Sequence, residues 1–275
     1  IINFKNFNNK QSKLTYTVQN KNFSKKDKTK INVGFIGAGN YASRVLLPLL
    51  KKNKNLTLKN LVSINGLNSK YHGNKNGFVY SSSLDQDIFD DKDINTVFIT
   101  TRHNLHYSQI IKSLESGKHV FVEKPITLKE DEFNQLCSKY ENINKDQKNK
   151  LKIMIGYNRR FSPLTKLTKN LLNSYQAKKI FIRYDIHAGQ IPNDHWLRDF
   201  EVGGGRFLGE GVHFIDYAYY LINKKITKYH CIGTKNDGFS ASLFFEDNSI
   251  ANINYIVDSS PNLEKEKIEV HFNDK

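Results

Sequence analysis

Residues 31–42 read INVGFIGAGNYA, an apolar run followed by the pattern G-x-G-x-x-A. The apolar run predicts a buried strand, and the turn after it leads into a helix. The first glycine permits a tight turn, the second lets the backbone approach a pyrophosphate, and the alanine allows close packing of helix on strand. The free N–H groups at the start of the helix would face the anion. The segment therefore predicts a dinucleotide-binding turn with contacts from Gly37, Ala38, Gly39, Asn40 and Tyr41.

Strand and helix patterns alternate after this turn. We expect strands at 56–64, 78–80, 96–100, 120–122 and 151–155, and helices at 40–50, 105–115 and 129–140. Pro48 would distort the last turns of the first helix. Strands that are apolar throughout and alternate with helices imply a parallel sheet covered on both faces. We therefore expect an α/β fold in which residues 31–157 form a doubly wound, Rossmann-type NAD(P)-binding domain.

The sequence changes character after Arg160. Residues 180–187 alternate between apolar and polar side chains, which is typical of a strand with one solvated face. A helix is expected at 207–222 and strands at 229–234, 240–245 and 249–257, with a hairpin turn at Asp247-Asn248. These patterns predict that residues 158–275 form an α+β domain with an open, mostly antiparallel sheet, which would serve the substrate and oligomerisation.

The two ends of the chain suggest a piece of a longer protein. Residues 1–30 are polar and rich in lysine, which favours a linker or the tail of an upstream region, with a weak strand pattern at 14–18. The chain begins with Ile1, and 267–272 looks like a strand that is cut short. We therefore expect a fragment whose second domain is incomplete at its C-terminal end.

Composition narrows the classes of protein. The 275 residues carry a net charge of +15, which raises a nucleic-acid hypothesis, but the lysines are spread along the chain without an arginine-rich stripe, so a solvated basic surface is favoured. Cys137 and Cys231 are too few and too far apart for a disulfide scaffold or a zinc site, which fits a reducing, cytoplasmic setting. No metal cluster is visible, and no apolar run is long enough for a membrane helix.

The cofactor preference is open. A dinucleotide fold often carries an acidic residue after its second strand to bind the ribose hydroxyls, but residues 62–66 read VSING. The absence of a carboxylate removes the repulsion of a 2′-phosphate, and Ser63 and Asn65 offer hydrogen bonds to either cofactor. Both NAD and NADP are therefore expected.

A lysine follows the strand expected at 120–122, in the tripeptide Glu123-Lys124-Pro125. Proline holds the residue before it in an extended backbone, so Lys124 would project from the strand tip. A lysine whose pKa is lowered by desolvation can shuttle a proton near neutral pH. Lys124 is therefore the candidate catalytic residue of a redox enzyme.

Taken together, several ordered segments resemble the glucose–fructose oxidoreductase/inositol dehydrogenase (Gfo/Idh/MocA) family. They are 34–40, 100–106, 123–125, 156–161 and 203–216, so the resemblance spans residues 31 to about 258. Residues 188–196 and 205–211 are more similar to a branch that is fused behind a zinc-type alcohol-dehydrogenase-like domain. That branch implies an upstream domain, to which residues 1–30 would form the junction.

The resemblance implies hydride transfer between a nicotinamide and a hydroxyl-bearing carbon of a sugar, sugar nucleotide or cyclic polyol. It implies catalytic roles for Lys124 and His213, with Asp216 on the same helix face to orient the histidine. The family pattern has an aspartate four residues before the histidine, where this chain has Gly209, and Glu210 is the candidate replacement. Further cofactor contacts are expected from Ser63, Thr100, Thr101, Asn104, His106 and Glu123. Substrate contacts are expected from Asn158, Arg159, Arg160, His195, Trp196 and His213.

Two other classes stay open. The glycine at position 209 motivates a catalytically silent cofactor- or sugar-binding module that serves a fused partner domain. A basic nucleic-acid-binding protein is the more distant alternative, and salt-sensitive binding to duplex DNA would be its signature. Proteins similar to this one pair through the open sheet face, so a homodimer or tetramer is expected.

Overall fold

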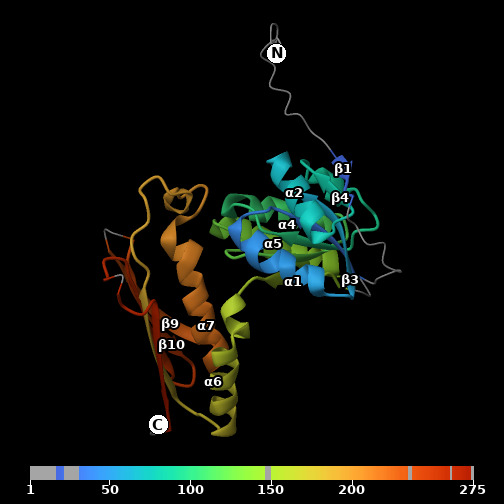
Figure 1. The fold of residues 1–275 in the computed structure, drawn as a ribbon. Coiled ribbons are helices and arrows are strands. Elements are labelled where there is room, and N and C mark those ends of the chain that lie inside the picture. The colour runs from blue at the N-terminus through green and yellow to red at the C-terminus, as the bar shows by residue number, and fades with distance from the viewer. Residues whose placement is uncertain (1–16, 22–30, 146–149, 235–236, 261, 274–275) are drawn as a thin grey trace. The chain divides into compact units, whose positions relative to one another are not determined.

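The computed structural model describes residues 17–21, 31–145, 150–234, 237–260 and 262–273 (Figure 1). The chain divides into two compact units. The first comprises Ile1–Thr100 and Lys112–Val120, and the second comprises Thr101–Ile111 and Phe121–Lys275. The two units are described in turn.

The first sheet has seven strands in the order β1-β4-β3-β2-β5-β6-β7. Their bounds are β1 Thr17–Gln19, β2 Ile31–Ile36, β3 Leu56–Val62, β4 Tyr80–Ser82, β5 Thr96–Ile99, β6 His119–Val122 and β7 Ile153–Ile155. β2 runs parallel to both β3 and β5, and β3 runs parallel to β4. The strand order therefore reverses at β2 and β5, which is the position where doubly wound sheets bind nucleotides.

An antiparallel edge strand begins the described chain. β1 pairs with β4, and the side chain of Asn20 donates hydrogen bonds to the Phe78 carbonyl at 3.0 Å and to Ser81 Oγ at 2.9 Å. This stretch lies within the segment expected to be a linker, and its strand joins the sheet of the first unit. The pattern expected at 14–16 lies outside the described residues.

The helices that accompany the first sheet follow the expected alternation, with two additions. They are the π turn η1 Ala42–Leu46, α1 Leu47–Lys52, α2 Gly66–Asn76, α3 Gln86–Phe89, the 3₁₀ turn η2 His103–Leu105, α4 His106–Glu115 and α5 Glu130–Asn144. Pro48 was expected to distort the last turns of the first helix, but it lies in the first turn of α1, and the irregular part is the π turn before α1. Helices α2 and α3 were not predicted. In the core of the first unit, Phe35 packs on Phe78 and Phe98.

The second unit is built on a five-stranded sheet in the order β12-β8-β11-β10-β9. The strands are β8 Ile180–His187, β9 Ile226–Gly233, β10 Phe239–Phe245, β11 Ile250–Ile256 and β12 Glu266–Phe272. All neighbouring strands are antiparallel except β8 and β11. The expectation of a mostly antiparallel second sheet is confirmed.

Helices cover one face of this sheet, as Figure 1 shows for α7. The helical segments are η3 Asn158–Phe161, α6 Pro163–Ser174, η4 Trp196–Arg198, the π turn η5 Phe207–Gly211 and α7 Val212–Ile222. Phe214 and Leu221 of α7 pack in one buried cluster with Ile182, Tyr184 and Ile253 of the sheet.

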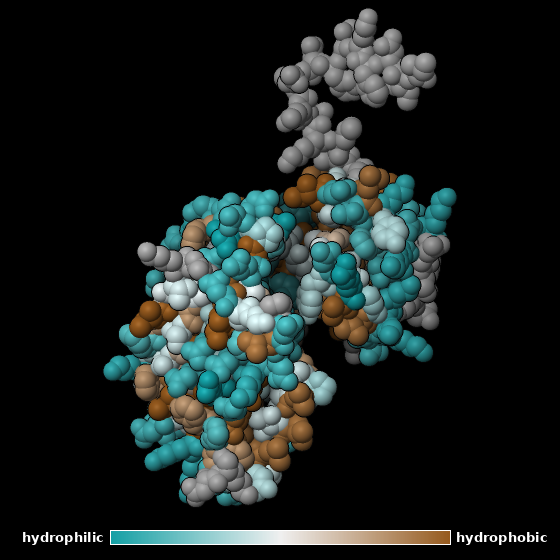
Figure 2. Space-filling model, turned by 60° about the vertical axis from the view of Figure 1, so that its left-hand side comes forward, coloured by the Kyte–Doolittle hydropathy of each residue, from teal (hydrophilic) through white to brown (hydrophobic). Residues whose placement is uncertain are grey.

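The opposite face of the second sheet carries polar side chains together with exposed apolar ones such as Phe181, Ile232 and Ile256. Ser240 and Ser242 donate hydrogen bonds across the strand pair to Asn254 and Asn252, each at 2.8 Å, and Asn254 donates to Asp185 at 2.7 Å. Figure 2 shows hydrophilic residues spread over the visible surface, with apolar residues in small groups among them. Across the described ranges, none of the helices has the length and apolar character needed to cross a membrane.

Candidate active site

The dinucleotide turn in the first unit has the backbone that its sequence predicts. Gly37 follows β2 with φ +100°, a conformation that side chains rarely adopt. A Cβ atom there would lie 2.6 Å from the carbonyl oxygen of Thr100 and 2.9 Å from Thr100 Oγ1. The Thr100 hydroxyl in turn donates to the carbonyl of Ile36 at 3.2 Å. Gly37 is therefore required because the turn passes directly against the end of β5.

Gly39 has a different environment from Gly37. A Cβ atom on Gly39 would find no atom within 4 Å, so the turn presents open space on this side. Asn40 and Tyr41 are exposed at the start of the helix, and the first helical hydrogen bond there joins the Ser43 N–H to the Gly39 carbonyl at 2.9 Å. An open glycine at the N-terminus of a helix fits a dinucleotide pyrophosphate. After β3, Ser63 is half-buried, whereas the Asn65 side chain caps α2 by accepting the Leu67 N–H.

The candidate catalytic lysine lies in the second unit, two residues after β6. The partly buried Lys124 ammonium donates a hydrogen bond to the backbone carbonyl of Gly209. Burial lowers the pKa of Lys124, and the carboxylates of Glu210 and Glu123 partly oppose this shift. The surroundings therefore favour a lysine that gives up its proton more readily than an exposed one.

Glu123 lies beside the lysine in a confined position. Its Oε1 atom is shielded from solvent and has no hydrogen-bond partner among the described residues. A Cβ atom on Gly156 would lie 2.7 Å from this oxygen, so the glycine makes room for the carboxyl group. Burial raises the pKa of Glu123 to about 7, although Lys124 opposes the shift. The carboxyl group is therefore poised to change protonation near neutral pH.

His213 lies in the first turn of α7, close enough to Lys124 for the lysine charge to lower the pKa of the imidazole. Burial lowers the pKa of His213 to about 3, with further lowering from Lys124 and Arg159. Its Nδ1 atom has no hydrogen-bond partner within the described part of the chain, and its ring centroid lies 6.4 Å from that of Tyr157. The imidazole is therefore neutral over the physiological pH range and available to accept or donate a hydrogen bond.

The carboxylate expected to orient His213 has another partner. Asp216 accepts a hydrogen bond from Arg160 Nε at 2.7 Å and a second from Arg160 Nη2. The Asp216 side chain is 7% exposed. Asp216 and Arg160 therefore form a partly buried ion pair that holds η3 against α7.

Arg159 is also bound to a carboxylate. Its guanidinium donates to Glu266 of β12, with Nη2 at 2.7 Å from Oε1, and Nη1 lies 3.2 Å from the Tyr184 hydroxyl. Tyr184 donates to the same carboxylate at 2.6 Å. Both arginines that were expected to contact the substrate thus bind carboxylates of their own chain. The neighbouring Asn158 is exposed.

Glu210, the candidate replacement for an aspartate, belongs to a second network. Its Oε2 accepts from Arg206 Nε and Nη2, each at 3.2 Å, and from the Tyr255 hydroxyl. Arg206 is buried and also donates to the Gly189 carbonyl at 2.7 Å. Glu210 acts on Lys124 through its charge, while its hydrogen bonds go to Arg206 and Tyr255.

The loop after β5 is held by buried histidines. His106 Nδ1–H donates to the Pro125 carbonyl at 2.7 Å, and its Nε2 lies 3.3 Å from the Thr101 carbonyl oxygen. His106 is fully buried, and burial lowers its pKa. It therefore positions the backbone that follows Lys124. Thr101 donates its hydroxyl to Gln109 at 2.7 Å, whereas Asn104 is exposed.

His103 was not among the predicted site residues. Its Nδ1–H donates to the Gly203 carbonyl at 2.8 Å, and burial lowers its pKa to about 4. Its ring packs edge-on against Trp196 at 4.8 Å, and the Arg102 guanidinium lies 4.0 Å above the Trp196 ring. His195 accepts the Leu197 N–H through Nδ1 and so begins the short turn that carries Trp196. His103 lies in the sequence between Thr101 and His106, which were both predicted contacts, and this position could have identified it as a site residue.

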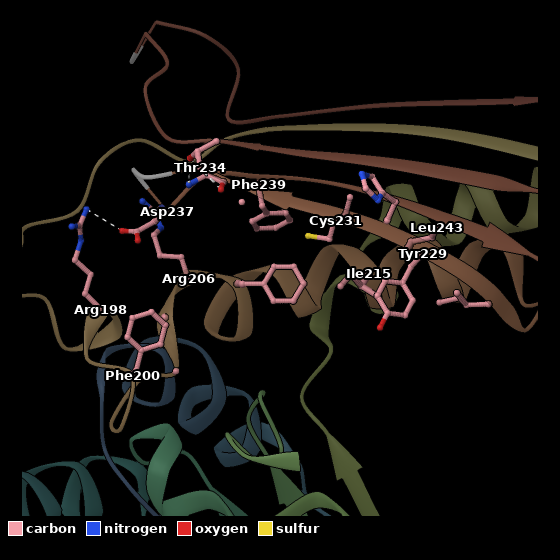
Figure 3. Close-up of a pocket in the computed structure, with 18 residues that line it drawn as sticks. Arg198, Phe200, Arg206, Ile215, Tyr229, Cys231, Thr234, Asp237, Phe239 and Leu243 are labelled. Carbon is pink, nitrogen blue, oxygen red and sulfur yellow. Dashed lines mark hydrogen bonds and ion pairs between the residues drawn. The ribbon is translucent and has the colours of Figure 1, made fainter. Parts of the chain in front are cut away.

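A cavity of about 680 Å³ lies elsewhere in the second unit (Figure 3). It opens between the region of η5 and α7 and the strands β9 and β10, where Phe207 and Phe239 meet edge to face at 4.9 Å. Figure 3 shows the ion pair between Arg198 and Asp237, 3.1 Å long, at one end. Lys124 and His213 do not line this cavity. In the described part of the chain, no group of His, Cys, Asp or Glu side chains is arranged to hold a metal ion.

The comparisons with known proteins agree with these features. A family model, GFO_IDH_MocA, described as "Oxidoreductase family, NAD-binding Rossmann fold", matches residues 31–147. Residues 31–147 are thus similar to the NAD-binding Rossmann domain of the Gfo/Idh/MocA oxidoreductases.

Two curated relatives come from Bacillus subtilis (strain 168). "Uncharacterized oxidoreductase YrbE" is 24% identical over 74% of this chain and 57% of its own length. "scyllo-inositol 2-dehydrogenase (NAD(+))" is 28% identical over 51% of this chain and 39% of its own length. The chain thus matches about half the length of these relatives. Among solved structures, levoglucosan dehydrogenase in complex with NADH and levoglucosan shares the fold, with a TM-score of 0.75 and 20% identity over 88% of this chain and 71% of that one.

Proposed function

We propose that this protein is an NAD(P)-dependent oxidoreductase that moves a hydride between the nicotinamide and a hydroxyl-bearing carbon of a sugar-like substrate. The observation that carries the proposal is the environment of Lys124. It is partly buried, its pKa is lowered, and it is bound to a neutral carbonyl beside the neutral His213. A proton acceptor of this kind is what oxidation of an alcohol requires.

The dinucleotide turn and Lys124 would supply different parts of this reaction. Residues Gly37 to Tyr41 would hold the pyrophosphate, and the bound nicotinamide would accept or return the hydride. In the oxidation direction the substrate C–H bond breaks, and the hydroxyl proton passes to the neutral amine of Lys124. In the reverse direction the Lys124 ammonium returns that proton to the carbonyl oxygen. His213 would hydrogen-bond the reacting oxygen.

The ion pairs of the second unit favour an uncharged substrate. An arginine recognises a carboxylate or phosphate best when its planar fork is free. The Arg159 fork is engaged by Glu266, and the Arg160 fork is engaged by Asp216. We therefore favour a neutral sugar or cyclic polyol over a sugar acid or sugar nucleotide, with His195 and Trp196 as candidate contacts for the sugar ring.

The finer features of the family resemblance belong to the same proposal. We assign residues 31–157 to cofactor binding and 158–275 to the substrate, with NAD and NADP both acceptable because no carboxylate follows Val62 at 63–66. The outer face of the second sheet, which combines polar side chains with exposed apolar ones, is the candidate surface for a homodimer or tetramer. Sedimentation that gives a monomer at all concentrations would contradict this. A cytoplasmic location and an upstream alcohol-dehydrogenase-like domain complete the proposal.

Titration of the protein with NADH and with NADPH, followed by nicotinamide fluorescence, tests the first step. Micromolar binding of either cofactor is expected. A screen of neutral sugars and polyols then compares the natural protein with Lys124→Met and with Lys129→Ala. Lys129 is an exposed lysine of the same unit that pairs with Glu201. Loss of turnover only in Lys124→Met, with cofactor binding kept, is the expected result.

A silent binding module is the second candidate. It is favoured by the carboxylate of Glu210, which bonds to Arg206 and Tyr255 instead of to the lysine. Such a module would bind the cofactor or a sugar equally well with Lys124→Met and would show no turnover with any substrate. These results would favour the binding module over the enzyme.

A further inference from the structure

The hydrogen-bond partner of Lys124 is a neutral group in a position that has no side chain. Gly209 lies in the π turn η5 and is buried. A Cβ atom on Gly209 would overlap Leu197 Cδ1, and it would lie 3.2 Å from Leu197 Cγ and 3.4 Å from His103 Cε1. Leu197 is itself buried, with 6% of its surface exposed. A side chain at position 209 would therefore require Leu197 to shift, and in the structure the Gly209 carbonyl is the acceptor.

We propose that the Gly209 carbonyl is the positioning group for the Lys124 amine, and that Leu197 keeps this position free of a carboxylate. The inference rests on the proposed role of Lys124 in proton transfer. Neither a glycine nor a leucine would be expected to have such a function from its residue type alone.

The physical reason lies in the difference between a carbonyl and a carboxylate. A carbonyl only accepts, so one N–H of Lys124 can point to it whether the amine is charged or neutral. The lone pair of the neutral amine then points away from Gly209. A carboxylate at the same place would stabilise the ammonium selectively and hold the proton on the lysine.

The other charges around Lys124 do not replace this contact. Glu210 is bonded to Arg206 and Tyr255, and the Lys124 ammonium donates to Gly209. Glu123 is largely protonated below its pKa of about 7. The titratable and charged groups that act on Lys124, or that it acts on, are Glu123, Glu210, Arg159, His103, His106 and His213.

The test measures the pKa of Lys124 directly, from its 13Cε and 15Nζ shifts in lysine-labelled protein, assigned by loss of the signal in Lys124→Met. The central pair of variants is Gly209→Asp with Leu197→Ala and Gly209→Asn with Leu197→Ala. The leucine change makes room, and aspartate and asparagine have nearly the same shape. The aspartate variant is expected to raise the Lys124 pKa by about 1 to 3 units over the asparagine variant.

Single variants test the positioning. Gly209→Ala alone is expected to displace the turn and to perturb the Lys124 signals or prevent folding, and adding Leu197→Ala should restore the natural spectrum. Equal Lys124 pKa values in the aspartate and asparagine variants would overturn the inference. So would Gly209→Ala with an unchanged Lys124 signal and unchanged turnover. Cofactor titration and turnover of the natural protein are separate readouts, so failure of the proposed function is distinguishable from failure of this inference.

Discussion

The ion pair between Arg160 and Asp216 provides the sharpest test of how the second unit is held together. Two charge-assisted hydrogen bonds join the groups, and Asp216 is almost completely buried while the Arg160 side chain is 33% exposed. Removing one partner of a fully buried pair costs about 3–5 kcal/mol. Because solvent screens the arginine, we expect Asp216→Asn to cost about 2 kcal/mol. Replacing both residues should recover part of this loss.

A double-mutant cycle measures the coupling. The variants are Asp216→Asn, Arg160→Met and the pair together, and their unfolding in urea is followed by the fluorescence of Trp196. Trp196 is the only tryptophan and lies in the second unit, so its signal reports that unit. We expect a coupling energy of about 1–2 kcal/mol. A coupling energy within error of zero would contradict the role of the ion pair. A change in the pKa of His213 in Asp216→Asn would show that Asp216 acts on the histidine.

Three further outcomes are expected. Gly37→Ala should lose about 1–3 kcal/mol of stability in thermal unfolding, because its Cβ would meet the Thr100 carbonyl. Gly39→Ala should unfold like the natural protein and lose only affinity for NADH. Equal stabilities of the two variants would contradict the turn geometry. The raised pKa of Glu123 means that its stabilising contribution is present below pH 4.5 and is lost as pH rises through about 7. The natural protein should therefore lose about 3 kcal/mol relative to Glu123→Gln over this range, and parallel curves of stability against pH would refute the shift. The lowered pKa of His213 gives the opposite pH dependence, because stability that is present above pH 6.5 is lost as pH falls toward about 3. The stability of His213→Phe, measured by urea titration at successive pH values, should therefore be less sensitive to acid than that of the natural protein. Equal sensitivity would show that the imidazole is exposed.

The Rossmann half could be predicted largely from sequence because its signals are local. The turn at Gly37 and the apolar strand runs each depend on a few consecutive residues, and the strands at 31–36 and 96–99 were expected almost to the residue. The third expected strand, at 78–80, was wrong by two residues, since β4 covers Tyr80–Ser82. Short strands next to a loop carry too few apolar residues to define their ends.

Helix α2 illustrates what hydrophobic periodicity cannot detect. Its buried face consists of Ser69, Gly73 and Asn76, so it has no apolar stripe. Gly73 packs so closely that a Cβ atom there would overlap Ser81 Oγ. Its capping signals, Asn65 before it and the left-handed Gly77 after it, were present in the sequence and define the helix better than its hydropathy does.

The partners of the site residues were less predictable than the residues themselves. Helical spacing placed Asp216 on the same face as His213, but Arg160, from a distant segment, binds the carboxylate. The acceptor of Lys124 is a backbone atom, and no residue pattern reports which carbonyl is free. Sequence reasoning thus identifies candidate groups, whereas their pairing depends on contacts between segments far apart in the chain.

The second sheet has a consequence for the order in which the chain folds during synthesis. Its strand β8 lies between β11 and β12, which are made much later, and the carboxylate that binds Arg159 belongs to β12. The parallel pairs among β2, β3, β4 and β5 can form while these segments are still inside the ribosome. The nascent chain must therefore carry β8 with both of its edges open until β11 emerges, and with one edge open until Glu266 and the rest of β12 emerge. This interval is when the protein is most exposed to aggregation and to capture by chaperones.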